Sequence, residues 1–349
     1  MTLAFLVPGA LDQITGGYIF DRKVVEGLRA MGRGVMVSEL DGRFPDADDA
    51  ARAAAAAALK RLPADSAAVI DGLALPGFTE CLASEARRLR LIGFVHNPLS
   101  YDTGLDAVTT QRYAAIEARL WPLLRGVICP SAHTARAVIA AGVSADRVAV
   151  ANPGTDRPGT LSLRTPDGAL RLLAVGNVSR HKGHLVLVEA LAGLRDLDWR
   201  LMCVGSLERD RAAVAAIRQA IETHDLGGRV TLAGECARER VDAAYCDAEI
   251  FVLPSYGEGY GMVYAEALAY GLPIVATNAG AVPETVPASA GLLVPPGDEI
   301  ALRDALRRVI CDVNLRDRLA AGASLAARAL RDWPAAVRAW GAALDRLAT

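Results

Sequence analysis

Two carboxylates and several glycines lie close together in the segment SYGEGYGMVYAEALAYG (255–271). Glu258 is flanked by Gly257 and Gly259, and Glu266 follows eight positions later. Glycines let a backbone approach a ligand closely, and the free N–H groups at a helix start bind phosphate. A phosphate would repel both carboxylates, so we expect them to bind neutral hydroxyls on either side of it. A nucleotide-sugar has this order of groups, with the sugar at one end, the diphosphate in the middle and the ribose at the other end.

The same spacing also fits an exposed loop acid followed by an ordinary helix acid. A second segment, AVGNVSRHKGHLVLVEAL (174–191), favours the ligand hypothesis because it puts Arg180 and Lys182 between a predicted strand and a predicted helix. These two cations could offset the charge of a diphosphate, and Gly183 would open the helix. Solvated surface side chains are the alternative interpretation of this pair.

The first half of the chain contributes two further candidate sites. The segment PGALDQITGGYIFD (8–21) contains Gly16 and Gly17, which permit a second close approach to phosphate or form a plain turn. His96 ends the apolar run LIGFVH (91–96), which places it at the ligand-binding rim if the sheet is parallel. A buried, hydrogen-bonded structural histidine is the alternative.

No metal site is predicted. His181 and His184 are three positions apart, but no nearby carboxylate or cysteine completes a ligand set. Two D-x-D pairs occur, at 46–48 and 196–198, and neither follows a strand end. We interpret the first as the acidic start of a helix over 46–62 and the second as a surface loop.

Short apolar runs alternate with helical patterns along the whole chain, which predicts parallel sheets covered on both faces. The pattern restarts after residue 168, so we predict an α/β protein with two doubly wound Rossmann-like domains in tandem. The predicted strands lie within 3–7, 34–40, 67–71, 91–96, 126–131 and 148–154 in the first half, and within 171–177, 199–206, 229–235, 248–255, 272–278 and 290–297 in the second.

The length of 349 residues also favours two domains. We predict an N-terminal domain over 1–155, a linker over 156–168 that is rich in Pro, Gly and Thr, and a second domain over 169–330. A hinge at the linker would leave a ligand cleft between the domains. The last segment, 328–347, is predicted to be an amphipathic helix broken at Pro334.

Composition excludes several classes of partner. With 38 Lys and Arg against 40 Asp and Glu, the net charge of −2 argues against nucleic acid and against a generic anionic membrane. The six cysteines are scattered, which favours reduced thiols and a cytoplasmic location. No apolar run approaches the ~18 residues of a spanning helix. Peripheral membrane contact stays open.

Taken together, these segments resemble the retaining glycosyltransferases of family 4, which have the GT-B fold. The similarity covers nearly the whole chain and is strongest in EGYGMVYAE (258–266), which matches the Glu-x7-Glu signature, and in the following ALAYGLPIVATNAGAVPETV. VGNVSRHKG resembles the family's cationic diphosphate loop, ITGGY its first glycine loop, and CPSAHTARAVIAAGV with VANPGTD the end of its first domain. The resemblance implies that the domains face each other across a cleft and that a C-terminal helix over 331–349 returns to the first domain, anchored by Trp333 and Trp340.

The resemblance also implies roles for the candidate residues. Glu258 would bind the hydroxyls of the transferred sugar, Glu266 would bind the ribose, and His96 would contact the sugar near the reacting carbon. Arg180 and Lys182 would stabilise the departing diphosphate. Donor contacts would come from the glycine loop and from the backbone that follows Glu258, at Gly16, Gly17, Gly259, Tyr260, Gly261 and Met262. Many family members have arginine directly after the glycine of the diphosphate loop, whereas this chain has Asn177 there.

The function that follows is transfer of a hexose from a donor of the UDP-glucose or GDP-mannose type, with retention and without a metal or cofactor. The acceptor would be a small molecule, a saccharide or a lipid. The alternatives are an inactive nucleotide-sugar-binding partner subunit, or a nucleotide-sugar epimerase or hydrolase on the same fold.

Overall fold

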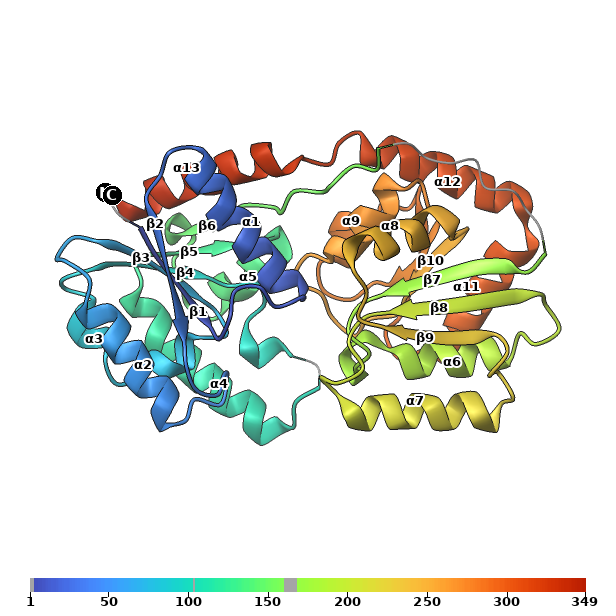
Figure 1. The fold of residues 1–349 in the computed structure, drawn as a ribbon, viewed down its shortest axis with the longest axis horizontal. Helices are drawn as coiled ribbons and strands as arrows, with labels where there is room; N and C mark the ends of the chain where they lie inside the picture. Colours follow the sequence, from blue (N-terminus) through green and yellow to red (C-terminus); the bar gives the residue numbers. More distant parts are fainter. Residues whose placement is uncertain (1–2, 103, 160–167) are drawn as a thin grey trace. The chain divides into compact units, whose positions relative to one another are not determined.

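The computed structural model describes residues 3–102, 104–159 and 168–349 (Figure 1). The chain forms two compact units. Unit 1 comprises Met1–Gly154 and Arg331–Thr349, and unit 2 comprises Thr155–Leu330. Most of the predicted linker over 156–168, namely 160–167, lies outside the described residues.

Unit 1 is built on a six-stranded sheet in the order β2-β1-β3-β4-β5-β6, and each neighbouring pair is parallel. Its strands are β1 (Leu3–Pro8), β2 (Val35–Leu40), β3 (Ala67–Asp71), β4 (Arg90–Phe94), β5 (Gly126–Cys129) and β6 (Val148–Val150). Its α-helices are α1 (Gly16–Ala30), α2 (Asp49–Lys60), α3 (Leu82–Glu85), α4 (Ala107–Leu120), α5 (Ala132–Ala140) and α13 (Trp333–Ala348). Short 3-10 helices are η1 (Leu75–Phe78), η2 (Leu99–Tyr101), η3 (Trp121–Leu123) and η4 (Ala145–Arg147).

Unit 2 is built on a second six-stranded parallel sheet, in the order β12-β11-β10-β7-β8-β9. Its strands are β7 (Leu170–Val175), β8 (Trp199–Val204), β9 (Val230–Gly234), β10 (Ile250–Leu253), β11 (Ile274–Thr277) and β12 (Gly291–Val294). Its helices are η5 (Arg180–Lys182), α6 (His184–Ala192), α7 (Arg211–Thr223), α8 (Arg238–Asp247), α9 (Met262–Ala269), α10 (Val282–Thr285), α11 (Glu299–Cys311) and α12 (Val313–Ala327). The predicted α/β class with two doubly wound sheets is thus confirmed.

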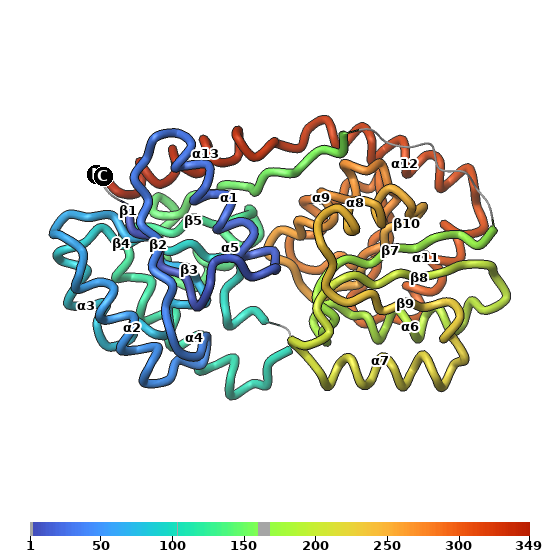
Figure 2. The backbone as a smooth tube through the Cα atoms, in the orientation of Figure 1, coloured from blue at the N-terminus to red at the C-terminus, as the bar shows by residue number. Residues whose placement is uncertain are grey.

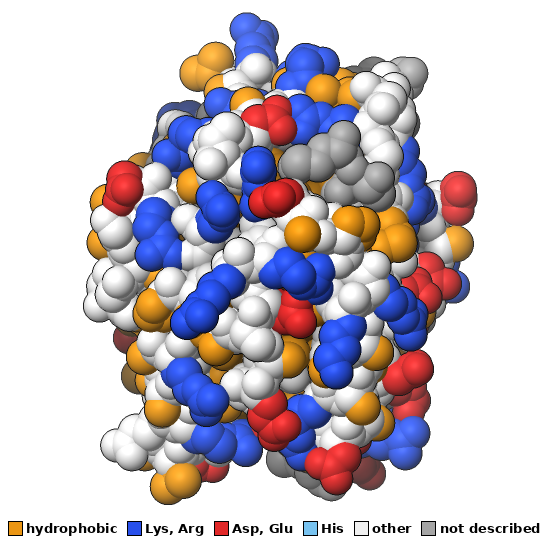
Figure 3. All heavy atoms as spheres, turned by 90° about the vertical axis from the view of Figure 1, so that its left-hand side faces the viewer, with side chains coloured by type: hydrophobic (Ala, Val, Ile, Leu, Met, Phe, Trp, Pro, Cys, Tyr) orange, Lys and Arg blue, Asp and Glu red, His pale blue; other side chains and the backbone are white. Residues whose placement is uncertain are grey.

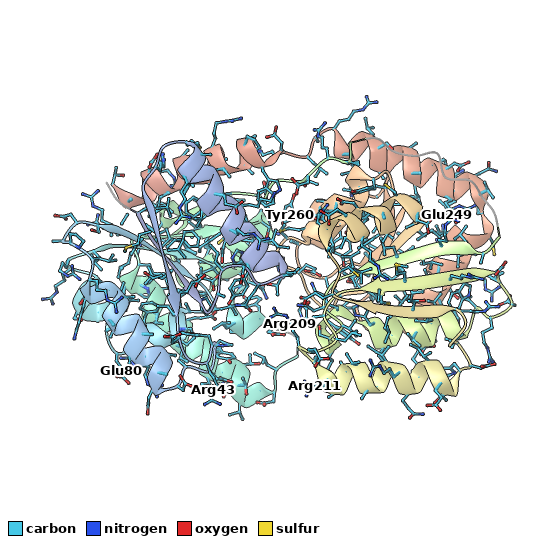
Figure 4. All side chains as sticks on the ribbon, in the orientation of Figure 1. Arg43, Glu80, Arg209, Arg211, Glu249 and Tyr260 are labelled. Carbon is cyan, nitrogen blue, oxygen red and sulfur yellow. The ribbon has the colours of Figure 1, made fainter. Side chains whose placement is uncertain are left out.

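The central strands are apolar except where β3 ends in Asp71 and β11 in Thr277, because helices cover both faces of each sheet. Every residue of β1, β3, β5, β10 and β11 is buried. Parallel strands have their carboxyl ends at one edge of a sheet, so the loops after β1, β3 and β4 in unit 1 gather at one edge. The loops after β7, β8 and β10 gather at the corresponding edge of unit 2. In unit 2, Figure 4 shows Glu249 at the start of β10 and Tyr260 beyond its end.

The C-terminal helix α13 packs on unit 1, where it contacts α1, β4 and β5 (Figures 1 and 2). Trp340 is fully buried, and its ring centroid lies 6.1 Å from that of Phe5 and 5.4 Å from that of Phe94. The prediction of a helix broken at Pro334 was wrong. Proline is tolerated in the first helical turn, where no N–H is needed, so α13 simply begins at Trp333.

The described surface carries charges of both signs. Figure 3 shows Lys and Arg side chains intermixed with Asp and Glu on one face. Among the described residues, no helix combines the length and apolarity needed to cross a membrane. All six cysteines are free.

Candidate functional site

The loop after β7 carries the two cations that the sequence singles out, but their surroundings differ. Arg180 is exposed, and its side chain has no hydrogen bond or ion pair with any described residue. Lys182 points inward, with its Nζ 2.7 Å from Oε1 of Glu258. Its stem passes within 3.7 Å of the position that a β-carbon on Gly176 would take. Of the two, Lys182 is the one held in place.

Glu258 lies on the loop after β10, and only 9% of its side chain is exposed. Its Oε1 accepts hydrogen bonds from Lys182 and from Oγ of Ser255, each at 2.7 Å. Its Oε2 receives no hydrogen bond from the described residues, and this oxygen is not fully buried. One oxygen therefore fixes the carboxylate, and the other stays open to a ligand.

Glycines bring these two loops together. Gly183 caps α6 with φ +71°, and a β-carbon there would lie 2.1 Å from the carbonyl oxygen of Pro254. Nε2 of His181 lies 2.6 Å from the carbonyl oxygen of Gly257. Gly280, at φ +61°, allows the backbone after β11 to pass the loop, since a β-carbon there would lie 2.4 Å from the carbonyl oxygen of Glu258.

The segment after Glu258 leads into α9 through Gly261, which has φ +81°. Gly259 and Tyr260 are partly exposed on this loop, and Met262 is the first residue of α9. The carbonyl oxygen of Tyr260 accepts a hydrogen bond from Thr285 at 2.7 Å. The loop is thus tied to α10, and Gly259 stays partly exposed while Gly261 is buried.

Glu266 lies on the second turn of α9 and faces α8. Its Oε1 accepts a hydrogen bond from Arg238 and its Oε2 one from the hydroxyl of Tyr245, each at 2.9 Å. Burial opposes the charge of Arg238, but the carboxylates of Glu266 and Asp242 raise its pKa. A cavity of about 370 Å³ adjoins this cluster and is lined by Asp156, Arg157, Pro158, Gly159, Arg238, Asp242, Cys246 and Tyr270. Sequence reasoning missed the partners of Glu266, because nothing in the pattern of α8 sets Arg238 apart from other exposed arginines.

In unit 1, His96 lies two residues beyond β4 and contacts two buried carboxylates. Its Nε2 lies 2.9 Å from Oδ1 of Asp21 and 3.3 Å from Oδ2 of Asp71. Asp71 ends β3, and Asp21 lies on the second turn of α1. Gly16 and Gly17 form the first turn of α1 instead of preceding it, and a β-carbon on Gly17 would lie 3.4 Å from the His96 ring.

This cluster shifts the pKa of two of its members. Burial raises the pKa of Asp21 to about 7, with Asp71 acting in the same direction and His96 opposing it. Burial alone would lower the pKa of His96, but the charges and hydrogen bonds of Asp21 and Asp71 raise it to about 10. The value for His96 indicates that the imidazole keeps its proton at neutral pH. Sequence reasoning missed both aspartates, although an acidic residue at the end of the buried strand AAVID was a usable signal for Asp71.

Among the described residues, this trio is the one group whose carboxylate and imidazole atoms lie close enough, within 4.8 Å of one another, to hold a cation. Aspartates of both D-x-D pairs make hydrogen bonds or ion pairs within the protein. Asp48 caps α2 by accepting from the N–H of Ala51, and Asp46 accepts from the hydroxyl of Tyr113. Asp196 pairs with Arg307 at 2.8 Å on the surface. The helix-start and surface-loop interpretations are therefore confirmed.

Two family models match the chain, one over most of the first half and one over most of the second. The model described as Glycosyltransferase Family 4 matches residues 33–157, and the model described as Glycosyl transferases group 1 matches residues 169–312. The chain belongs to the GT-B glycosyltransferases. Solved structures agree with this assignment for the fold over nearly the whole length.

A sucrose-phosphate synthase from Thermosynechococcus elongatus superposes on this GT-B chain with a TM-score of 0.80 at 23% identity, covering 98% of this chain and 97% of that one. HepE of Anabaena, solved with UDP and glucose, has a TM-score of 0.77 at 19% identity and covers 99% of both chains. At these identities the likeness concerns the fold.

Curated relatives of this GT-B chain match over shorter segments. D-inositol 3-phosphate glycosyltransferase from Nocardioides sp. is 47% identical over 88 residues, which are 25% of this chain and 19% of the relative. Sucrose-phosphate synthase from Zea mays is 46% identical over 67 residues, which are 19% of this chain and 6% of the relative. The matches thus span at most about a fifth of these relatives' lengths.

Proposed function

We propose that this GT-B glycosyltransferase transfers a hexose from a nucleoside-diphosphate sugar to an acceptor hydroxyl, with retention at the anomeric carbon. The observation that carries the proposal is the geometry at Glu258. Lys182 and Ser255 fix its Oε1, while its Oε2 is free to accept a hydrogen bond from a sugar hydroxyl. Lys182 lies within reach of the same ligand and supplies positive charge for a diphosphate.

In this proposal the cations act mainly on the leaving group. As the bond to the sugar breaks, negative charge builds on the departing phosphate, and fixed positive groups stabilise that charge in the transition state. Lys182 is pre-positioned for this role, and the exposed Arg180 would move onto the diphosphate. The backbone from Gly259 to Met262 would contact sugar and phosphate.

Glu266 would bind the ribose. Because its two oxygens already accept from Arg238 and Tyr245, the carboxylate is held in one orientation and keeps lone pairs for ribose hydroxyls. We propose UDP-glucose as the first donor to test, since HepE is similar in fold and was solved with UDP and glucose, and GDP-mannose as the second. Retention rests on the similarity of residues 258–266 to the family 4 signature.

The acceptor would bind to unit 1, near His96 and the glycine pair Gly16–Gly17. We propose a small molecule, a saccharide or a lipid headgroup in this place. The reaction needs no metal in this scheme, because Lys182 and Arg180 supply the charge that a divalent ion would otherwise provide. The rate should therefore be unchanged by EDTA, and a loss of activity that Mg²⁺ or Mn²⁺ restores would contradict this point.

The test is release of nucleoside diphosphate from the donor, compared between wild type and Lys182→Ala. Losing a preorganised charge of this kind costs on the order of a hundredfold in turnover. Lys60→Ala, which removes an exposed lysine of unit 1, is the matched control and should keep full activity. Wild-type turnover in Lys182→Ala would defeat the assignment, and donor binding without any turnover would favour the inactive partner subunit.

Retention is tested separately by proton NMR of the product. A coupling constant at the anomeric proton that matches the donor's configuration supports retention, and the opposite configuration excludes it.

A further inference from the structure

His96 is held by two carboxylates that the reaction scheme above does not use. The single Nε2 position faces both Asp21, at 2.9 Å, and Asp71, at 3.3 Å. Oδ1 of Asp71 is occupied by the backbone N–H of Leu73 at 2.7 Å, so its carboxylate is itself fixed. Nε2 lies within hydrogen-bond reach of both carboxylates, and as an N–H it can donate to either one.

The ring of His96 is also held by packing. Its centroid lies 4.4 Å from that of Phe94 and 5.8 Å from that of Phe20, and Gly17 leaves room for its edge. A ring flip would bring a C–H group against two buried carboxylates. The Nε2-inward orientation is therefore the stable one.

The two aspartates need a cation. Asp21 is completely buried and Asp71 is 3% exposed, and Oδ2 of Asp21 has no hydrogen-bond partner in the part of the chain that the structure describes. A buried carboxylate without a compensating charge is strongly unfavourable. Among the described residues, the charged groups that act on His96 are these two, from α1 and from the end of β3, and its neighbours Phe20, Phe94 and Thr134 are uncharged.

The second ring nitrogen of His96, Nδ1, faces away from the two carboxylates. Nδ1 makes no hydrogen bond with any described residue, and this nitrogen is not fully buried. About a fifth of the side chain is exposed, at 21%. Nδ1 is therefore the atom that can meet a ligand.

We propose that Asp21 and Asp71 are positioning residues that keep His96 protonated, with Nε2–H bound inward and Nδ1–H presented as a fixed hydrogen-bond donor. An imidazolium has no acceptor nitrogen, so His96 donates to an oxygen of the ligand and does not act as a general base at neutral pH. The raised pKa of His96 agrees with this state, because the charges and hydrogen bonds of Asp21 and Asp71 favour the imidazolium. The identity of the ligand oxygen, on the donor sugar or the acceptor, rests on the proposed function, but the protonation state does not.

The protonation state is measured by 15N NMR of the ring nitrogens as a function of pH, on the full chain without ligand. The chain has five histidines, and His96→Gln assigns the signal of His96. We expect His96 to be protonated at pH 8 in wild type. Loss of a neighbouring opposite charge in Asp21→Asn should lower its pKa by about one to three units.

Glu117→Gln is the matched control. Glu117 is another buried carboxylate of unit 1, 5% exposed, and it binds the N–H of Leu99 instead of His96. This variant should leave the pKa of His96 in place even if it lowers stability. If Asp21→Asn does not fold, the wild-type measurement still decides, because a neutral His96 at pH 8 would overturn the proposal.

Activity provides the second readout. In Asp21→Asn, kcat/KM should lie within about threefold of wild type near pH 6 and fall by pH 9 as His96 loses its proton, by about twofold if the pKa drops one unit and about tenfold if it drops two. An equal loss of kcat/KM at every pH would mean that Asp21 has only a structural role. A His96 signal that shifts with micromolar Zn²⁺ or Mn²⁺ would overturn the proposal in favour of a cation site. If no donor is turned over, the NMR result stands and only the proposed function fails.

Discussion

At the scale of single residues, the site depends on which oxygen or nitrogen atoms are already occupied. The sequence predicted Glu258, Glu266, Lys182 and His96 as candidates because of their types and their places after predicted strands. It could not predict the distant partners, since Tyr245 and Asp21 are brought to Glu266 and His96 only by tertiary packing. Those partners determine which atoms of each candidate residue can still bind a ligand.

The cluster around His96 makes a prediction about stability and pH. Because folding raises the pKa of His96 from 6.5 to about 10, its contribution to stability is complete below about pH 6.5 and is lost as the pH rises through about 10. Asp21, whose pKa is also raised by folding, acts in the same direction between about pH 4 and 7. Wild type should therefore lose melting temperature from neutral to alkaline pH.

The comparison is with Asp21→Asn, whose melting temperature should vary less over the same range, because the asparagine does not titrate and the pKa of His96 returns toward its ordinary value. Thermal unfolding of both proteins at a series of pH values measures this difference. Parallel curves for the two proteins would contradict the coupling between Asp21 and His96.

At the scale of elements, the strands were the most predictable part of the molecule. All twelve predicted segments overlap a strand, because the buried parallel strands of such sheets appear in the sequence as short apolar runs. The start of α13 was predicted less well, since a proline in a helical pattern marks either a break or a first turn. The contacts between loops were not predictable, because they depend on glycine conformations that only the folded backbone reveals.

Substitution of Gly183 tests whether the contact between the loops after β7 and β10 holds the site together. A β-carbon there would lie 2.1 Å from a backbone oxygen at φ +71°, so Gly183→Ala should destabilise unit 2 by more than about 1 kcal/mol. It should also weaken donor binding by moving Lys182 away from Glu258. Chemical denaturation and a binding titration measure the two effects.

The control for this glycine is Gly228→Ala. Gly228 is exposed, and nothing lies within 4 Å of a β-carbon built there, so the change should stay within about 0.5 kcal/mol. Equal effects of the two substitutions would mean that the contact between Gly183 and Pro254 is not what holds the loops together.

At the scale of the whole molecule, unit 1 is completed by the last stretch of the chain. Arg331–Thr349 belongs to this unit, and α13 brings Trp340 against Phe5 and Phe94. Arg33 and Asp345 form an ion pair, and Arg346 donates to the carbonyl oxygen of Val148 at 3.0 Å. The resemblance to family 4 implied this return, whereas periodicity alone predicted only an amphipathic helix.

Removing this anchor should affect one unit selectively. Trp340→Ala should destabilise unit 1 by about 3–5 kcal/mol, because it leaves a cavity in a fully buried core. Hydrogen exchange should then rise in the strands of unit 1 and not in those of unit 2. Leu325→Ala, at a side chain on α12 that is 63% exposed, is the control, and exchange that rises equally in both units would contradict the assignment of α13 to unit 1.

The central claim is that unit 2 binds a nucleoside-diphosphate sugar between Glu258 and Glu266. The measurement that tests it most directly is thermal unfolding of the protein with millimolar UDP, GDP, ADP or TDP and their common sugars. A ligand of the folded state raises stability by RT ln(1 + [L]/Kd), so a donor stands out from the other nucleotides.

We expect a rise in melting temperature with one nucleotide and its sugar, absent in Glu266→Ala and retained in Asp317→Ala, which removes an exposed acid of α12. No rise with any nucleotide, or an equal rise in Glu266→Ala, would contradict it.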